Sequence, residues 1–291
     1  MIAFRRKSRS VGPERGRPID ALGWFRVSWR AAGLLIALLI CVPVHYIWRA
    51  IHYGSPMPRV FLYCAARLCG ARLRVHGTPL KRDVFYISNH LSWVDILALG
   101  GASGTAFVSK AEIGQAPLVG WLAKLNRTVF VSREDRLGVA EQINRLREAL
   151  ADNWAITVFP EGTTTDGQSL LPFKTSMLRV LEPPPPGVLV QPVALDYGEV
   201  AEWIGWIGTE SGKDNALRIL GRRGSFRLDI HFLDPFDPRD FPGRKAIAAE
   251  ARNRIVPAME RNLGKALRPF AHDVPQVGYT VASARQQDRA A

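Results

Sequence analysis

The chain has 291 residues, 47% of them hydrophobic, and a formal net charge of +13. This length fits one large domain with appendages, and the apolar content is enough for a substantial core. No zinc-finger, helix-turn-helix or RNA-binding signature accompanies the positive charge, so nucleic acid is not an expected partner. The three cysteines and six histidines have neither disulfide nor metal-ligand spacing, so we expect a reducing cytoplasm and no metal site.

The N-terminal segment, residues 1–30, carries eight Lys/Arg against two acidic residues, which predicts attraction to an anionic membrane surface. Ala31–Trp48 is mostly apolar and is flanked by tryptophans and a tyrosine, as in an aromatic belt. Its strictly apolar part, Ala31–Val44, is 14 residues long, too short to span a ~30 Å bilayer core comfortably. With a second stretch at Pro58–Ala71, we expect residues 31–71 to form a membrane-associated helical hairpin; a single span is the alternative.

Residues 72–270 alternate strand-like and helical patterns, which predicts an α/β domain with a mostly parallel, seven-strand sheet flanked by helices. Apolar periodicity predicts helices over Leu137–Leu150 and, near the C-terminus, over Ile247–Leu263. The polar tail, residues 271–291, is predicted to be disordered. The predicted strands are Leu73–His76, Val84–Ser88, Ala106–Ser109, Thr128–Ser132, Ala155–Phe159, Val188–Leu195 and Phe226–Phe232.

A histidine and an aspartate lie five positions apart just after the second predicted strand, in the segment Asn89–Asp95. A neutral imidazole such as that of His90 is the usual base for removing a hydroxyl proton at neutral pH. Asp95, in the first turn of the following helix, can accept the other ring N–H and stabilise the imidazolium. Ser92 and Asp95 also fit a helix capping box, which is a purely structural explanation of both residues.

A second apolar run, Ile156–Phe159, ends in the turn Pro160–Thr163, which carries a carboxylate at Glu161. Gly162 suits such a turn because glycine adopts positive φ without strain. Ligands of α/β sheets bind at strand ends, where His90 and Glu161 are both expected. The alternative is an ordinary turn with a solvated Glu161.

These two motifs, in this order, resemble the HxxxxD and FPEG blocks of the glycerolipid acyltransferases, above all the bacterial 1-acyl-glycerol-3-phosphate acyltransferases. The resemblance implies that His90 is the general base and Asp95 its orienter, with no covalent acyl-enzyme. It also implies that Glu161, Gly162 and Thr163 line the acceptor site. No metal and no organic cofactor is implied; the acyl donor would be acyl-CoA or acyl carrier protein.

Two further positions concern an acceptor phosphate. Arg133 matches an arginine that binds this phosphate in the family, and its guanidinium suits an anionic oxygen pair; the alternative is a surface arginine paired with an acidic neighbour. An arginine commonly follows the FPEGT string, but Thr164 stands there in this chain. Lys174 is the nearest downstream cation that could replace it.

The expected function is transfer of a fatty acyl group to the sn-2 hydroxyl of 1-acyl-glycerol-3-phosphate, giving phosphatidic acid. Two alternatives are a lyso-ornithine-lipid O-acyltransferase, which has no acceptor phosphate, and a catalytically inactive membrane-binding module. Thr164 favours the first alternative, and the intact His90 and Asp95 oppose the second. Because thioester donors are cytoplasmic, we expect the enzyme on the cytoplasmic face of the inner membrane.

Overall fold

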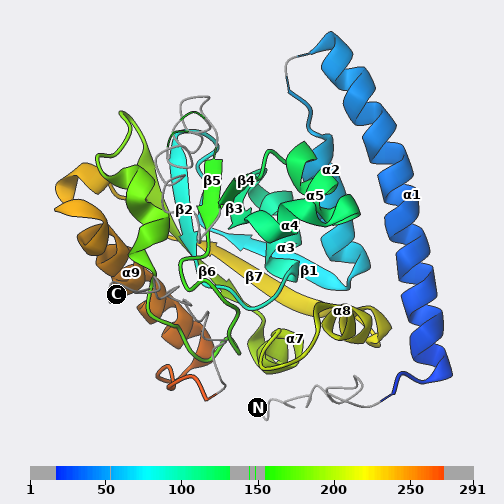
Figure 1. The fold of residues 1–291 in the computed structure, drawn as a ribbon. Coiled ribbons are helices and arrows are strands. Elements are labelled where there is room, and N and C mark those ends of the chain that lie inside the picture. The colour runs from blue at the N-terminus through cyan, green and yellow to red at the C-terminus, as the bar shows by residue number, and fades with distance from the viewer. Residues whose placement is uncertain (1–17, 53, 132–143, 145–147, 149–154, 272–291) are drawn as a thin grey trace, which may run out of the picture.

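The computed structural model describes residues 18–52, 54–131, 144, 148 and 155–271. Its centre is a seven-stranded sheet with the order β1-β7-β6-β2-β5-β3-β4 (Figure 1). All neighbouring strands pair in parallel except β6 and β7, so β1 and β7 run opposite to the other five. The strands are β1 (Ala71–His76), β2 (Val84–Ser88), β3 (Ala106–Lys110), β4 (Val129–Val131), β5 (Ala155–Val158), β6 (Leu189–Asp196) and β7 (Phe226–Phe232).

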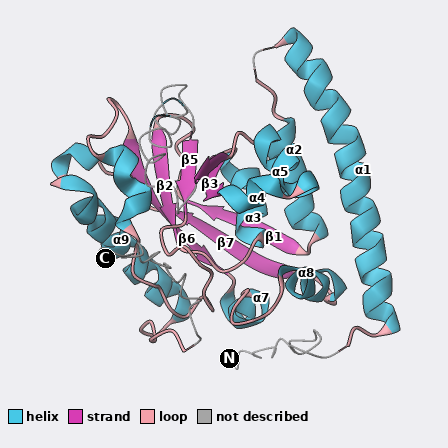
Figure 2. Ribbon diagram, viewed as in Figure 1, coloured by secondary structure: helices cyan, strands magenta, loops and turns pink. Residues whose placement is uncertain are grey.

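Helices cover both faces of the sheet, as Figure 2 shows. One face packs against α9 (Gly243–Leu263), and the other against α2 (Met57–Leu68) and α3 (Val94–Ser103). The mostly parallel α/β fold predicted from the sequence is confirmed. The shorter helices are α4 (Ala111–Gln115), α5 (Pro117–Leu125), α7 (Ala201–Ile204), α8 (Gly212–Gly221) and the 3-10 turns η1 (Thr175–Leu181), η2 (Gly198–Val200) and η3 (Pro238–Asp240).

The strand predictions hold because the central strands are buried on both faces. Every residue of β2 and of β5 is buried, as expected for parallel strands that read as continuous apolar runs. The predicted C-terminal helix is α9, and Pro257 lies inside it. The helix predicted over Leu137–Leu150 falls largely outside the described residues.

The N-terminal hairpin consists of α1 (Ala21–Ile51) and α2, which pack against each other (Figure 1). Asp20 caps α1 by accepting a hydrogen bond from the Gly23 amide at 2.6 Å. With 31 residues, α1 is about 46 Å long. It is therefore longer than the apolar run seen in the sequence, and it continues through Pro43.

The second helix of the hairpin belongs to the domain as much as to the hairpin. α2 packs closely on α3 because Gly101 has no side chain: a Cβ there would lie 2.7 Å from the Tyr63 Cα. Leu62 and Ala66 of α2 are buried in this contact region. The hairpin is thus fixed to the face of the sheet that α3 covers.

Two arginines of the basic N-terminal segment bind the protein itself. Arg30, 7% exposed, donates hydrogen bonds to the carbonyls of Ile219, Leu220 and Gly224 at 3.2, 2.7 and 3.0 Å. Arg26 donates to the Gly221 carbonyl at 3.3 Å. These carbonyls lie at and just beyond the C-terminus of α8. A cation stabilises this end of a helix because the helix dipole is negative there. The expectation that the whole segment faces anionic lipid therefore needs correction for Arg30.

The rest of α1 has a long apolar surface. Within the described residues, α1 is the one helix long and apolar enough to cross a membrane, with a mean hydropathy of 2.1 over its best 18-residue window and 11% of that window buried. Large exposed apolar side chains run along it from Leu22 to Ile51. Such a continuous exposed apolar surface is typical of contact with a membrane or a protein partner.

Candidate active site

The two residues of the first motif meet where β2 ends. β2 stops at Ser88, His90 follows in the connecting loop, and Asp95 lies in the first turn of α3. His90 Nδ1 lies 2.7 Å from Asp95 Oδ2. The Asp95 side chain is fully buried, whereas that of His90 is 17% exposed. The loop and helix positions predicted for the two residues are both observed.

Asp95 accepts hydrogen bonds from backbone amides as well as from His90. Its Oδ2 also accepts hydrogen bonds from the amides of Leu91 and Ser92, at 2.6 and 2.9 Å. The Ser92 contact is one half of a capping box, so the structural and chemical explanations of Asp95 apply together. With Nδ1–H donating to Asp95, Nε2 of His90 carries the lone pair and is the atom that can accept a proton.

A tyrosine distant in sequence completes this arrangement. The hydroxyl of Tyr197, 2% exposed, donates a hydrogen bond to Asp95 Oδ1 at 2.5 Å. Burial, together with the neighbouring Asp95 carboxylate, raises the pKa of Tyr197 well above its ordinary value, so the hydroxyl stays protonated and donating. Sequence analysis missed Tyr197 because no local pattern links it to a residue 102 positions earlier.

The second motif lies beside the first because β5 pairs in parallel with β2. The Phe159 ring stacks on the His90 ring, with 4.1 Å between centroids and an interplanar angle of 15°. Gly162 has φ +72°, the left-handed conformation expected of a glycine at this turn. The two strand ends therefore bring both motifs to one edge of the sheet, as predicted.

The buried side chain of Glu161 connects two loops at this edge of the sheet. Its side chain is buried, and its two oxygens accept hydrogen bonds from the amides of His90 and Leu171, each at 2.8 Å. Burial raises its pKa to about 8, against the lowering effect of these two amides. A solvated Glu161, the structural alternative, is thus wrong; both carboxylate oxygens are used to connect the two loops.

Of the remaining predicted binding residues, Thr163 and Lys174 lie at the same turn. Thr163 is half-buried, and the Thr164 hydroxyl donates to the Trp206 carbonyl. The Lys174 amide donates to the Pro160 carbonyl at 2.8 Å, and the Lys174 residue is exposed. Arg133 lies outside the described residues, so its predicted role stays a prediction.

An apolar cavity of about 550 Å³ lies between the hairpin and the domain. Trp93 and Phe107 line it, and the Phe107 ring stacks with Phe159 at 6.1 Å. Phe159 stacks in turn on His90, so aromatic rings connect the cavity wall to the His90–Asp95 pair. Other residues of its wall include Leu34, Leu38, Cys41, Leu62, Ile96 and Leu122.

Comparison with known proteins agrees with this geometry. The family model described as "Acyltransferase" matches residues 72–196. A lyso-ornithine lipid O-acyltransferase of Rhizobium meliloti is 31% identical over 274 residues, covering 87% of this chain and 92% of the relative. One from Rhodobacter capsulatus is 31% identical over 269 residues, covering 85% and 95%. A 1-acyl-sn-glycerol-3-phosphate acyltransferase of Neisseria gonorrhoeae is 36% identical over 97 residues, covering 33% and 38%.

The fold has a counterpart among solved structures. The 1-acyl-sn-glycerophosphate acyltransferase PlsC of Thermotoga maritima superposes with a TM-score of 0.61 at 21% identity, covering 82% of this chain and 97% of that one. The family match and the relatives that cover most of the chain define it as an acyltransferase. The chain belongs to the glycerolipid acyltransferase family and is an enzyme of that family. The inactive membrane-binding module therefore has no support.

Proposed function

We propose that this protein transfers a fatty acyl group directly from a thioester donor to a lyso-lipid hydroxyl, with lyso-ornithine lipid as the acceptor. The observation that carries acyl transfer is the pair of His90 Nδ1 and Asp95 Oδ2 at 2.7 Å, beside an apolar cavity. The choice of acceptor rests on Thr164 and on the relatives.

In this reaction, Nε2 of His90 removes the acceptor's hydroxyl proton while the oxygen attacks the thioester carbonyl. The C–S bond breaks, the ester forms, and the imidazolium returns its proton to the leaving thiolate. Asp95, fixed by two backbone amides and by Tyr197, stabilises the imidazolium during this exchange.

The acceptor assignment rests on the position where the family commonly has an arginine. Thr164 occupies it and is neutral, and its hydroxyl is engaged by the Trp206 carbonyl. The site therefore lacks one cation that would bind an acceptor phosphate. This difference favours an acceptor without a phosphate group. The relatives named as lyso-ornithine lipid acyltransferases also align over most of their length with this chain.

The second candidate acceptor is 1-acyl-glycerol-3-phosphate, which would give phosphatidic acid. Arg133, at the family's phosphate-binding position, supports it, as does the Neisseria relative that matches a third of this chain. Arg133 would also bind the carboxylate of an ornithine headgroup, so its presence alone does not separate the two acceptors.

The donor is acyl-CoA or acyl carrier protein, and we place its acyl chain in the cavity beside α1. The wall of this cavity is almost entirely apolar, and burying methylene groups there is favourable at about 0.8 kcal/mol each.

A panel of two acceptors and two donors tests the proposal. Purified protein should acylate lyso-ornithine lipid with a higher kcat/KM than 1-acyl-glycerol-3-phosphate, and the His90→Ala protein should acylate neither. The reverse preference would overturn the acceptor assignment while leaving acyl transfer intact. Acylation of neither lipid by wild-type protein, with both donors, would overturn the function itself.

We further propose that the domain lies on the cytoplasmic face of the inner membrane, with the α1–α2 hairpin returning the chain to the side it left. Single cysteines at Ser10→Cys and Gln286→Cys, in a parent without native cysteines, should both react with an impermeant reagent only after the membrane is opened. Reaction of Gln286→Cys in intact cells, with Ser10→Cys protected, would show a single span instead.

A further inference from the structure

Three side chains of metal-ligating type meet on β1 and β7, away from the catalytic pair. The histidines have no metal-ligand spacing in the sequence, but pairing of the strands places His76 directly beside His231. Asp229 lies two residues before His231 and so on the same face of β7. One ligand atom from each of the three residues lies within 4.8 Å of the other two.

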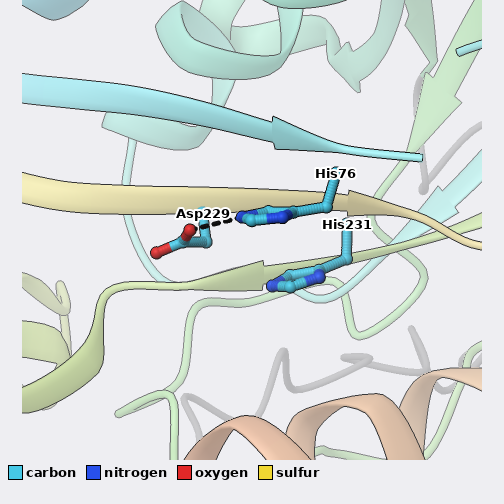
Figure 3. A group of neighbouring side chains, drawn as sticks. All are labelled: His76, Asp229 and His231. Carbon is cyan, nitrogen blue, oxygen red and sulfur yellow. Dashed lines mark hydrogen bonds and ion pairs between the residues drawn. The ribbon is translucent and has the colours of Figure 1, made fainter. Parts of the chain in front are cut away.

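The three side chains are directed toward one another (Figure 3). His76 Nε2 lies 2.5 Å from Asp229 Oδ1. The two imidazoles stack with 4.4 Å between centroids and 10° between planes. In Figure 3, both rings turn a nitrogen to the side on which Asp229 lies. A metal ion at this side would replace the proton between His76 and Asp229, with the rings tilting so that their in-plane lone pairs converge.

The surroundings permit this tilt and orient the carboxylate. The side chain of His76 is 43% exposed, which leaves room on its solvent side for the ring to tilt, whereas that of Asp229 is 3% exposed. Arg227 donates two hydrogen bonds to the Asp229 carboxylate, one to each oxygen, the bond to Oδ1 being 2.9 Å long. A ligating carboxylate held by an outer hydrogen-bond donor is a common feature of protein metal sites.

The donor set indicates the class of ion. Two imidazoles and one carboxylate suit zinc and its first-row neighbours, whereas calcium and magnesium prefer oxygen ligands alone. Three protein ligands leave one position of a tetrahedral ion for water. We propose that His76, Asp229 and His231 bind a divalent transition-metal ion of the zinc class and that this ion ties β1 to β7.

The proposed metal site would link the edge strand β1 to its neighbour β7. β1 is an edge strand that begins three residues after α2 ends, so it connects the hairpin to the sheet. Leu228 and Ile230 of β7 pack toward α2 and α3, which places Asp229 and His231 on the opposite face. The proposed ion therefore lies on the other side of the sheet from α3, which carries Asp95.

The test is metal binding by the purified full chain, measured after treatment with a chelator. Titration with Zn²⁺ should show one ion per chain, and Co²⁺ should give the visible absorption of a four- or five-coordinate site. His76→Ala and His231→Ala should each weaken binding by at least about tenfold, because loss of an outer-shell partner alone costs 10- to 100-fold. His52→Ala, which removes a histidine of the hairpin, is the matched control and should bind as wild type does.

Thermal unfolding provides a second measurement. Zn²⁺ should raise the melting temperature of the wild-type protein, since a ligand that binds only the folded state stabilises it. The exposed His76 makes His76→Ala the safer variant for folding, and its melting temperature should not respond to Zn²⁺. His90→Ala should keep full metal binding, so this result is independent of the proposed acyl transfer. Equal affinity and stoichiometry in wild-type, His76→Ala and His231→Ala proteins would overturn the proposal, as would absence of binding to wild type.

Discussion

Tyr197 donates a hydrogen bond to Asp95 Oδ1 at 2.5 Å. Both oxygens of this carboxylate thus accept hydrogen bonds, because Oδ2 accepts from His90 Nδ1. The carboxylate is fully buried, and two of its hydrogen-bond donors are backbone amides. In the proposed mechanism, Tyr197 is a positioning residue that acts on the reaction through Asp95.

Tyr197→Phe should lower kcat by roughly 10- to 100-fold, because a hydrogen bond to a charged group contributes roughly 1.5–3 kcal/mol. The acceptor KM should change little, because Tyr197 contacts the reacting groups only through Asp95. Tyr86→Phe is the control, since Tyr86 is buried but donates to the Leu80 carbonyl. Unchanged kcat in Tyr197→Phe would show a packing role only.

His90→Ala should lower turnover roughly 10²–10⁴-fold without loss of the fold, because the general base is removed. Asp95→Asn should also be severe, since an amide can hold the imidazole in the wrong tautomer. Steady-state assays with matched circular dichroism spectra check both variants. Near-native turnover of folded His90→Ala protein would contradict the mechanism.

The raised pKa of Glu161 should make the stability of the folded protein depend on pH. Its pKa is about 8 in the folded protein, above the ordinary 4.5, so the folded state binds more protons between these values. Stability from this group is therefore present below about pH 4.5 and is lost as pH rises through about 8, by at most about 1.4 kcal/mol per pH unit. Wild-type melting temperature should fall over this range more steeply than that of Glu161→Gln.

The same comparison with Glu199→Gln is the control, because Glu199 is exposed. Its melting profile should follow that of the wild type. Glu161→Gln should also be less stable than wild type at pH 7, because the new amide group faces a backbone N–H with a donor instead of an acceptor. Parallel pH profiles for wild type and Glu161→Gln would remove Glu161 as the cause.

Arg30→Ala should destabilise the packing of α1 on α8 by roughly 1.5–3 kcal/mol, because three carbonyls lose a charged donor. Limited proteolysis of detergent-solubilised protein should then cut near residues 18–20 faster than in wild type. Arg49→Ala, on an exposed part of the same helix, should leave the rate unchanged. Equal cutting of both variants would mean that α1 is held by its apolar contacts alone.

The strands and the two motifs could be predicted because their signals are local. Val84–Ser88 and Ala155–Val158 are continuous apolar runs, and each ends at a motif whose spacing carries its chemistry. The role of Glu161 could not be predicted, because whether a carboxylate meets solvent or backbone amides depends on a loop ten residues away. Tyr197 and the His76–His231 pair depend on strand order and register, which no single stretch of sequence specifies.

Arg30 also links α1 to the His90–Asp95 pair through a short chain of contacts. It binds carbonyls at the end of α8, and Asn215 of α8 accepts a hydrogen bond from the Trp93 indole at 2.9 Å, two residues before Asp95. The apolar helix α1 is consequently held to the domain by hydrogen bonds as well as by its packing on α2. In the proposed membrane-bound state, the depth of α1 in the bilayer therefore sets the height of His90 relative to the lipid.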